Sequence, residues 1–361
     1  MVHKILLTIS ILILAFGVFA QSGRNKPSET PTPSPTPKRL GGYIPTEKVI
    51  PIAANPLPNT SSTKKKNDDD DDGIIKVESN LVPIPASVLD TRGQTVGNLK
   101  LEDFLLQIDG SPVEIGELSR SESPVRLALL FDNSSSVTIA REFEKKAAVK
   151  FFRRVIRPDK DLVALFSVAT VSRLEQPLTK DVSLLVQATE NFAPPAGATA
   201  LLDGIIEAAQ YLREANGRRV IVIVSDGDDT VSDATFDETL KHLQIDNCQV
   251  YIVKTTDFEN AKRTGQRTGN ANLRQLAAER RMQEIAAQTG GAVYSPIDED
   301  ELDKAFAQIS AELAQQYVLS YYPENEADKR GEFRTISLSI KTRPNLSVRT
   351  RKGYYVPRKA S

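Results

Sequence analysis

The sequence predicts an α/β domain with a doubly wound, mostly parallel, Rossmann-like sheet, inserted into a split Ig-like β-sandwich formed by the N- and C-terminal flanks. Two observations support this prediction. Apolar β-branched runs alternate with amphipathic helical stretches between residues 125 and 315, which is typical of βαβ units. Both flanks show short strands and turns, and each flank alone is too small to bury a core of its own.

The N-terminal segment precedes the globular part. Residues 1–20 predict a secretory signal peptide, because Lys4 is followed by an apolar run and small residues precede a cleavage point after Ala20. The alternative is an uncleaved membrane anchor, although an apolar run of about 15 residues is shorter than a bilayer requires. We therefore expect a secreted, periplasmic or cell-surface protein. Residues 21–73 predict a disordered, Pro-rich linker that ends in the run Asp68 to Asp72.

Three segments follow the linker. The first part of the sandwich is expected over 74–122, the α/β domain over 123–315 and the second part of the sandwich over 316–357. Within the α/β domain, apolar runs predict strands at 125–131, 162–168, 220–225, 250–254 and 292–294, with 171–178 pairing at an edge. Periodic apolar positions predict helices at 139–156, 200–214, 234–243, 272–288 and 299–315.

Composition excludes several classes of function. The chain has 46 Lys and Arg against 47 Asp and Glu, so its net charge of -1 gives no reason to expect nucleic acid as a partner. The single cysteine, Cys248, excludes an intrachain disulfide and a four-cysteine zinc site, and we expect it to be a small core residue. Only two histidines occur, and His3 lies in the predicted signal peptide, which argues against most histidine-based catalysis.

Five oxygen-bearing residues lie where an open α/β sheet places its functional loops. Asp132, Ser134 and Ser136 follow the first predicted strand of the α/β domain, Thr199 precedes a helix, and Asp226 follows the most apolar strand. Two carboxylates and three hydroxyls are hard ligands that suit Mg²⁺ or Mn²⁺. Because they cancel the charge of the ion incompletely, we expect an Asp or Glu carboxylate of a protein partner to complete the site.

These residues resemble the metal-ion-dependent adhesion site of the von Willebrand factor A domain family. The resemblance covers about residues 125–315 and matches all five positions. It implies that Ser134 and Ser136 are direct ligands, that Thr199 is a direct or switchable ligand, and that Asp132 and Asp226 act largely through water. It also implies a non-enzymatic, adhesion-type module.

The flanks resemble a narrower group, the exported bacterial proteins related to von Willebrand factor A domains that were first grouped from Acidobacteria. The resemblance rests on residues 99–104 before the Asp109-Gly110 turn, on 288–291, on 317–323 and on 353–355. The resemblance implies that the α/β domain lies between flanks of this kind and that the protein is exported. It implies nothing about the identity of the ligand.

Two other functions stay open at this point. Asp132 could be the nucleophile of a Mg²⁺-dependent hydrolase or phosphotransferase, although the sequence has no second Asp two residues further on and no Gly-rich phosphate loop. Alternatively, the protein is a scaffold whose site is purely structural and meets no ligand. The Asp-x-Ser-x-Ser motif taken alone could also be a turn that caps the helix that follows it.

Two further groups of charged residues surround the predicted site. After the strand at 250–254, Lys254, Lys262, Arg263 and Arg267 are either an ordinary surface loop or a loop that opens on the site and steers acidic partners. The aspartates that follow Asp226 miss the spacing of a calcium loop, so we expect a solvated helix entry capped by Ser232 or Asp233.

Overall fold

The computed structural model describes residues 81–120, 123–138, 140–157, 159–265, 272–323 and 329–357. The predicted signal peptide and linker, and also Arg267, lie outside the described residues. Within the described ranges, no helix combines the length and the apolar character needed to cross a membrane.

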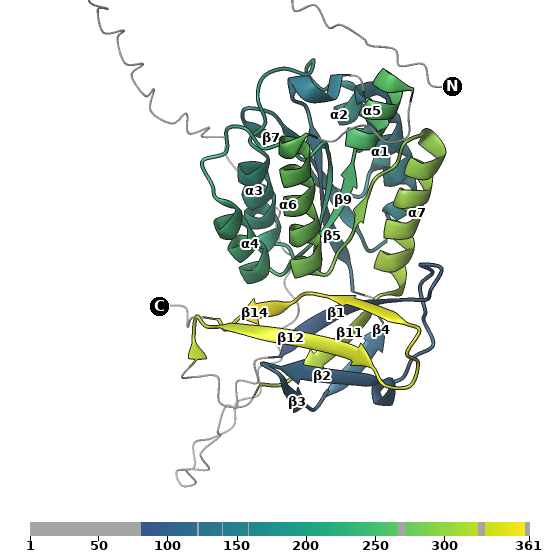
Figure 1. The fold of residues 1–361 in the computed structure, drawn as a ribbon, viewed down its shortest axis with the longest axis vertical. Helices are drawn as coiled ribbons and strands as arrows, with labels where there is room; N and C mark the ends of the chain where they lie inside the picture. The colour runs from purple at the N-terminus through teal and green to yellow at the C-terminus, as the bar shows by residue number, and fades with distance from the viewer. Residues whose placement is uncertain are drawn as a thin grey trace, which may run out of the picture. The chain divides into compact units, whose positions relative to one another are not determined.

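A six-stranded sheet with the order β10-β9-β8-β5-β6-β7 forms the centre of the α/β part (Figure 1). Five strands are parallel and β7 pairs antiparallel with β6 at one edge. The predicted mostly parallel sheet with an antiparallel edge strand is therefore confirmed. The strands are β5 (Val125–Asp132), β6 (Leu162–Val168), β7 (Ser172–Thr179), β8 (Arg218–Ser225), β9 (Cys248–Lys254) and β10 (Val293–Tyr294).

Helices cover both faces of this sheet, as its almost wholly buried central strands require. On one face lie α1 (Arg141–Val155), α2 (Val182–Glu190), α5 (Thr256–Thr264) and α7 (Glu299–Gln315). On the other lie α3 (Leu201–Arg213), α4 (Phe236–Ile245) and α6 (Leu273–Thr289). The five predicted helices are present, and α2 and α5 are additional. Both additional helices have nine residues, which gives too few turns for a clear apolar period.

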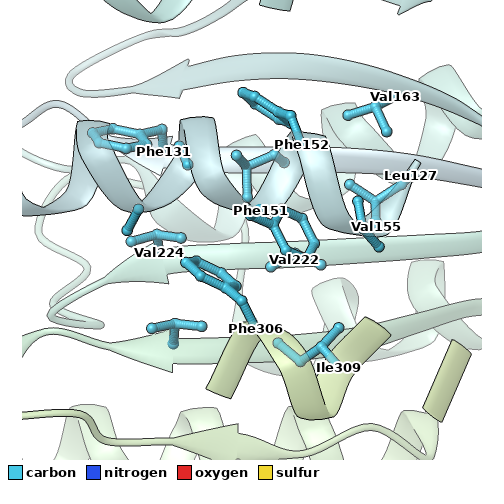
Figure 2. Close-up of a cluster of buried hydrophobic side chains, with 14 of the residues drawn as sticks. Leu127, Phe131, Phe151, Phe152, Val155, Val163, Val222, Val224, Phe306 and Ile309 are labelled. Carbon is cyan, nitrogen blue, oxygen red and sulfur yellow. The ribbon is translucent and has the colours of Figure 1, made fainter. Parts of the chain in front are cut away.

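Aromatic side chains fill the layer between the sheet and the α1–α7 pair. Figure 2 shows Phe151 of α1 beside Phe306 of α7 and above Val222 of β8, and the two ring centroids are 4.6 Å apart. Both rings are buried, and truncating a buried Phe to Ala costs about 3–5 kcal/mol. This layer fixes α1, which begins just after the predicted metal-binding loop.

Two four-stranded antiparallel sheets, with the orders β13-β1-β11-β4 and β14-β12-β2-β3, share a second core. Each sheet combines strands that precede the α/β part with strands that follow it, so the predicted split sandwich is confirmed. Ile84, Phe104 and Leu319 lie at its centre. The strands are β1 (Val82–Leu89), β2 (Phe104–Ile108), β3 (Ser111–Val113), β4 (Glu117–Arg120), β11 (Tyr317–Tyr321), β12 (Phe333–Ile340), β13 (Ser347–Thr350) and β14 (Gly353–Tyr355).

The basic segment after β9 differs from its prediction. It is helix α5 and not a loop, and it ends at Gly265, whose φ of 69° is the left-handed cap typical of glycine. Lys254 is buried and pairs with Glu279 at 3.2 Å and with Asp257 at 3.7 Å. Because both partners neutralise Lys254, this residue is not a free charge that could steer acidic partners.

Candidate functional site

Asp132 is the last residue of β5, and Asp226 directly follows β8, the neighbouring strand. The parallel register pairs Phe131 with Val224, so Asp132 lies beside Ser225. One carboxyl oxygen of Asp132, Oδ2, accepts a hydrogen bond from Ser225 Oγ at 2.5 Å. The other, Oδ1, accepts one from the backbone N–H of Ser134 at 2.9 Å. Both carboxylates therefore lie at the carboxyl edge of the sheet, where parallel strands place functional loops.

The two serine hydroxyls lie between these carboxylates. Ser134 Oγ and Ser136 Oγ are 2.9 Å apart, and the Ser136 side chain also hydrogen-bonds with Asp226. Ser134 is buried, whereas Ser136 is exposed. The hydroxyl pair therefore leads from the buried carboxylate of Asp132 toward solvent.

The Thr199 segment is attached to both neighbouring loops through its backbone. The N–H of Ser135 donates to the carbonyl of Gly197 at 3.2 Å, which connects this segment to the Asp132 loop. On the other side, the N–H of Thr199 donates to Thr230 Oγ1 at 2.9 Å, and the N–H of Thr230 donates to the carbonyl of Thr199 at 2.8 Å. The structure thus brings the three loops that carry all five predicted site residues together.

The site concentrates negative charge in a buried environment. Burial, and then the charge of Asp226, raises the pKa of Asp132 to about 6, against smaller opposing effects of hydrogen bonds from Ser225 and Ser134. Burial is also the main reason why the pKa of Asp226 is raised. A cation bound beside these carboxylates would favour their ionised forms and reverse both shifts.

Two acidic residues near the site were not predicted. Glu144 of α1 is 0% exposed, and neither carboxyl oxygen has a hydrogen-bond partner among the described residues. Burial, then the charges of Asp132 and Glu259, raises the pKa of Glu144 well above its usual value, and the Thr255 side chain opposes this only partly. Burial, then the charge of Asp226, raises the pKa of Glu259 to about 8. Glu144 could have been found in the sequence, because it shares the buried face of α1 with Ala148 and Phe151.

The aspartates after Asp226 have a structural role that the sequence analysis did not assign. Oδ1 of Asp229 accepts hydrogen bonds from the N–H groups of Leu201 and Leu202, at 2.8 and 3.2 Å, and so satisfies the start of α3. Helix α4 is capped by Thr235. The prediction of Ser232 or Asp233 as the cap is therefore wrong, because the capping-box partner Glu238 lies three residues after Thr235.

The side chains of the five predicted site residues carry only oxygen atoms that could bind a metal ion. Among the described residues, no group of three or more His, Cys, Asp or Glu side chains is arranged to hold a metal ion. A metal site at this edge would add the hydroxyls of Ser134, Ser136 and Thr199 to the two carboxylates. An all-oxygen set of this kind fits Mg²⁺ or Mn²⁺ and does not fit ions that prefer sulfur or imidazole.

Solved structures that match part of this chain include bacterial proteins. An aerotolerance-related membrane protein from Bacteroides fragilis is 20% identical over 52% of this chain and 98% of its own, with a TM-score of 0.41. A von Willebrand factor type A structure from Catenulispora acidiphila is 11% identical over 79% of this chain and 76% of its own, with a TM-score of 0.44. The PilB minor pilin from Streptococcus sanguinis is 12% identical over 54% of this chain and 62% of its own, with a TM-score of 0.41.

Because each TM-score is below 0.5, these similarities identify no ligand or partner for this chain. A search of curated protein sequences finds no match. The family model described as von Willebrand factor type A domain matches residues 127–228, a range that includes all five predicted site residues. This stretch, from β5 to just beyond β8, therefore carries a von Willebrand factor type A domain, as its motifs predict.

Proposed function

We propose that the protein is an exported, metal-dependent protein-binding module. In this proposal Asp132, Ser134, Ser136, Thr199 and Asp226 hold Mg²⁺ or Mn²⁺, and the ion captures an Asp or Glu side chain of a protein partner. Von Willebrand factor type A domains are typically protein-interaction modules, and most are not enzymes. Export rests on the predicted signal peptide at residues 1–20.

The single observation that carries the proposal is the hydroxyl-bridged pair of carboxylates at the edge of the sheet. Asp132 is fully buried and Asp226 is partly buried, and the pKa of each carboxyl group is raised. The hydroxyls of Ser134 and Ser136 lie between the two carboxylates. Such a cluster costs free energy when it is ionised, unless a cation neutralises it. A divalent ion would supply that charge.

The exposure of the donors supports capture of a ligand from outside. Asp132 lies deep in the protein, and its two oxygens already accept hydrogen bonds from Ser225 and Ser134. The exposed side of the cluster is at Ser136, where neutral hydroxyls would leave part of the charge of the ion uncancelled. An Asp or Glu side chain of a partner would neutralise this remaining charge, because its carboxylate is a negatively charged oxygen ligand.

The same contacts disfavour the hydrolase or phosphotransferase alternative. A nucleophilic carboxylate must reach the substrate with a free oxygen. Asp132 is 0% exposed, and both of its oxygens are held by hydrogen bonds. Its geometry suits a group that orients neighbouring hydroxyls and water.

Calorimetric titration of MgCl₂ and MnCl₂ into the purified protein, with and without sodium acetate, tests the proposal. Acetate stands in for the carboxylate of the partner, and acetamide is its uncharged control. We expect saturable metal binding that acetate tightens and acetamide does not, because the two ligands are coupled only through charge. Asp132→Ala and Thr199→Ala should each abolish metal binding, whereas Asp233→Ala, at an exposed position nearby, should leave it unchanged.

Two outcomes contradict the proposal in different ways. The absence of any saturable heat at millimolar metal would make the five residues structural. If the protein binds metal but acetate does not change the affinity, the metal site is real and its function is not the capture of a carboxylate.

A further inference from the structure

A cavity of about 220 Å³ lies between the sandwich and the end of the central sheet that is opposite to the metal-binding loops. Pro83 and Pro85 of β1 and Val318 of β11 line it on the sandwich side. On the other side it is lined by residues at the starts of β8 and β9, among them Arg218 and Cys248. Most of the exposed wall area is apolar, and the lining also includes the side-chain amides of Gln244, Asn247, Gln249, Gln288 and Gln316.

Three arginines line this cavity, Arg218, Arg219 and Arg351, and none of the described residues that line it is an Asp or a Glu. Arg351 is buried and donates to the side-chain oxygen of Asn247 and, at 2.8 Å, to the carbonyl of Pro83. All of these acceptors are uncharged.

The other two guanidinium groups also donate only to uncharged oxygens among the described residues. Arg218 donates to Gln316 Oε1 and to the carbonyl of Leu313, both at 2.7 Å. Arg219 donates to two backbone carbonyls, at 2.8 and 2.9 Å. The Nε atoms of Arg218, Arg219 and Arg351 are all buried without a partner in the described part of the chain.

Two carboxylates close to Arg218 and Arg219 are neutralised by other arginines. Asp161 pairs with Arg157 and Asp246 pairs with Arg213, each at 2.6 Å. Burial lowers the pKa of Arg351 to about 10, so this group is still charged at neutral pH. The cavity wall therefore carries a surplus of positive charge that no side chain lining it balances.

We propose that this cavity binds a small organic carboxylate with an apolar body. The guanidinium groups would pair with the carboxylate, because a guanidinium has five N–H donors and the hydrogen bonds described above use only some of them. The prolines, Val318 and Cys248 would contact the apolar body.

The size of the cavity favours an organic ligand over an inorganic anion. A cavity of about 150 Å³ in another protein is large enough to bind benzene. The volume of about 220 Å³ here has room for a ring of that size together with a carboxylate. Inorganic phosphate would leave the apolar walls without contacts.

The proposed cavity is independent of the metal site. Arg218 begins β8 and Ser225 ends it, so the two sites are separated by an eight-residue strand, which spans roughly 20 Å. Binding to the cavity can be measured while a chelator keeps the metal site empty.

The test is calorimetry of the full chain in the presence of a chelator, with benzoate as the probe. Benzamide is the uncharged control of the same shape, and inorganic phosphate is the anion without an apolar body. We expect one benzoate per chain with a dissociation constant on the order of 1 mM or tighter, and at least tenfold weaker binding of benzamide and phosphate. Benzoate should also raise the melting temperature.

Variants assign the binding to the cavity. Arg351→Gln should weaken benzoate binding at least tenfold, because it removes a buried charge from the wall. Since this substitution could also loosen the fold, Val318→Phe provides a second test that keeps all three arginines and fills the cavity, and it should block benzoate. Arg173→Gln, at an exposed position of the edge strand β7, should bind benzoate as the unsubstituted protein does.

Three results would overturn the inference. The first is no saturable benzoate binding to the folded, unsubstituted protein at millimolar concentrations. The second is benzamide or phosphate binding as tightly as benzoate. The third is unchanged benzoate affinity in a folded Val318→Phe variant.

Discussion

Two fully buried glutamates, Glu144 on α1 and Glu312 on α7, occupy opposite environments although their helices pack on the same face of the sheet. The Glu312 carboxylate accepts hydrogen bonds from the hydroxyls of Tyr251 and Tyr294, at 3.2 and 3.0 Å, and pairs with Arg349. The two carboxyl oxygens of Glu144 have no partner within ordinary hydrogen-bond distance among the described residues, and the nearby Thr255 side chain offsets the effect of burial only in part. A buried carboxylate that is fully paired contributes to the fold, whereas one without partners next to Asp132 needs an explanation in function.

The two ends of the central sheet also differ, in the sign of the charge that is left without a partner of opposite charge. At its carboxyl edge, Asp132, Asp226 and Glu259 have raised pKa values because burial and like charges act on them. At its amino edge, Arg218 and Arg351 line a cavity without a carboxylate among its described lining residues. Each end therefore has an excess of charge of one sign that a ligand from solution could balance: a divalent cation at one end and an organic anion at the other.

The largest effect that we predict is on the paired glutamate. Glu312→Ala should lower the free energy of unfolding by about 3–5 kcal/mol, because it removes a fully buried carboxylate and leaves the partly buried Arg349 guanidinium and the buried Tyr251 hydroxyl without their partner. Urea denaturation at neutral pH measures this change. Glu299→Ala, an exposed position in the first turn of the same helix, should cost less than about 1 kcal/mol. Equal losses in the two variants would contradict the structural role of Glu312.

The next effect is the pH dependence of the metal-free protein. A carboxyl group whose pKa is raised on folding binds its proton more tightly in the folded state, so stability falls as the pH rises from the unfolded pKa to the folded pKa. For Asp132 this window runs from 3.8 to about 6, and for Glu259 from 4.5 to about 8. We expect the melting temperature in chelator to fall between pH 4 and pH 8, and saturating Mg²⁺ to reduce the fall.

Asp161 and Asp109 do not offset this trend, because their pKa values are lowered and they titrate below the window. Melting curves at several pH values, with and without Mg²⁺, measure the effect. A metal-free protein that becomes more stable from pH 5 to pH 8 would show that Asp132 and Glu259 are neutralised by groups of the protein itself.

A smaller effect is expected for Glu144→Gln. Below pH 4.5 the carboxyl group is protonated in both the folded and the unfolded state and is neutral like the amide, so the variant should match the unsubstituted protein. As the pH rises above 4.5, the unfolded chain releases a proton that folded Glu144 retains, so the unsubstituted protein loses stability and the variant should become the more stable of the two, by about 1–3 kcal/mol in chelator. Glu142→Gln, exposed on the same helix, should show no such trend. A variant that is less stable at every pH would mean that the Glu144 carboxylate has a stabilising partner.

The fold was predictable where the chain repeats a period or concentrates apolar residues. Strand β6 and helix α7 have the bounds that their patterns predict. The meeting of Asp132 and Asp226 was predictable because parallel strands bring their carboxyl ends to one edge, and Thr199 was predicted there because it precedes a helix. Short helices such as α5 were missed because nine residues give too few turns for a periodic signal.

The charges inside the protein were harder to predict, because their meaning depends on contacts between distant parts of the chain. Glu144 and Glu312 are both acidic positions on amphipathic helices, and only the tertiary contacts of Tyr251, Tyr294 and Arg349 distinguish them. The cavity was equally hard to predict, because two of the arginines that line it, Arg218 and Arg351, are more than a hundred residues apart in the sequence.

The smallest effect that we predict is a change in helix α7 when the metal site is occupied. The helix packs on α1 through Phe306, and it continues through the buried Gln316 directly into β11 of the sandwich. Helix α1 follows the Asp132 loop and also carries Glu144. A bound cation that attracts the carboxylates of Asp132 and Glu144 would therefore shift the packing between α1 and α7. Hydrogen exchange of the amides of α7 should therefore change severalfold on addition of Mg²⁺ and acetate, and not in Asp132→Ala. Unchanged exchange in α7, with metal binding established by calorimetry, would confine the response to the loops and leave the sandwich uncoupled from the metal site.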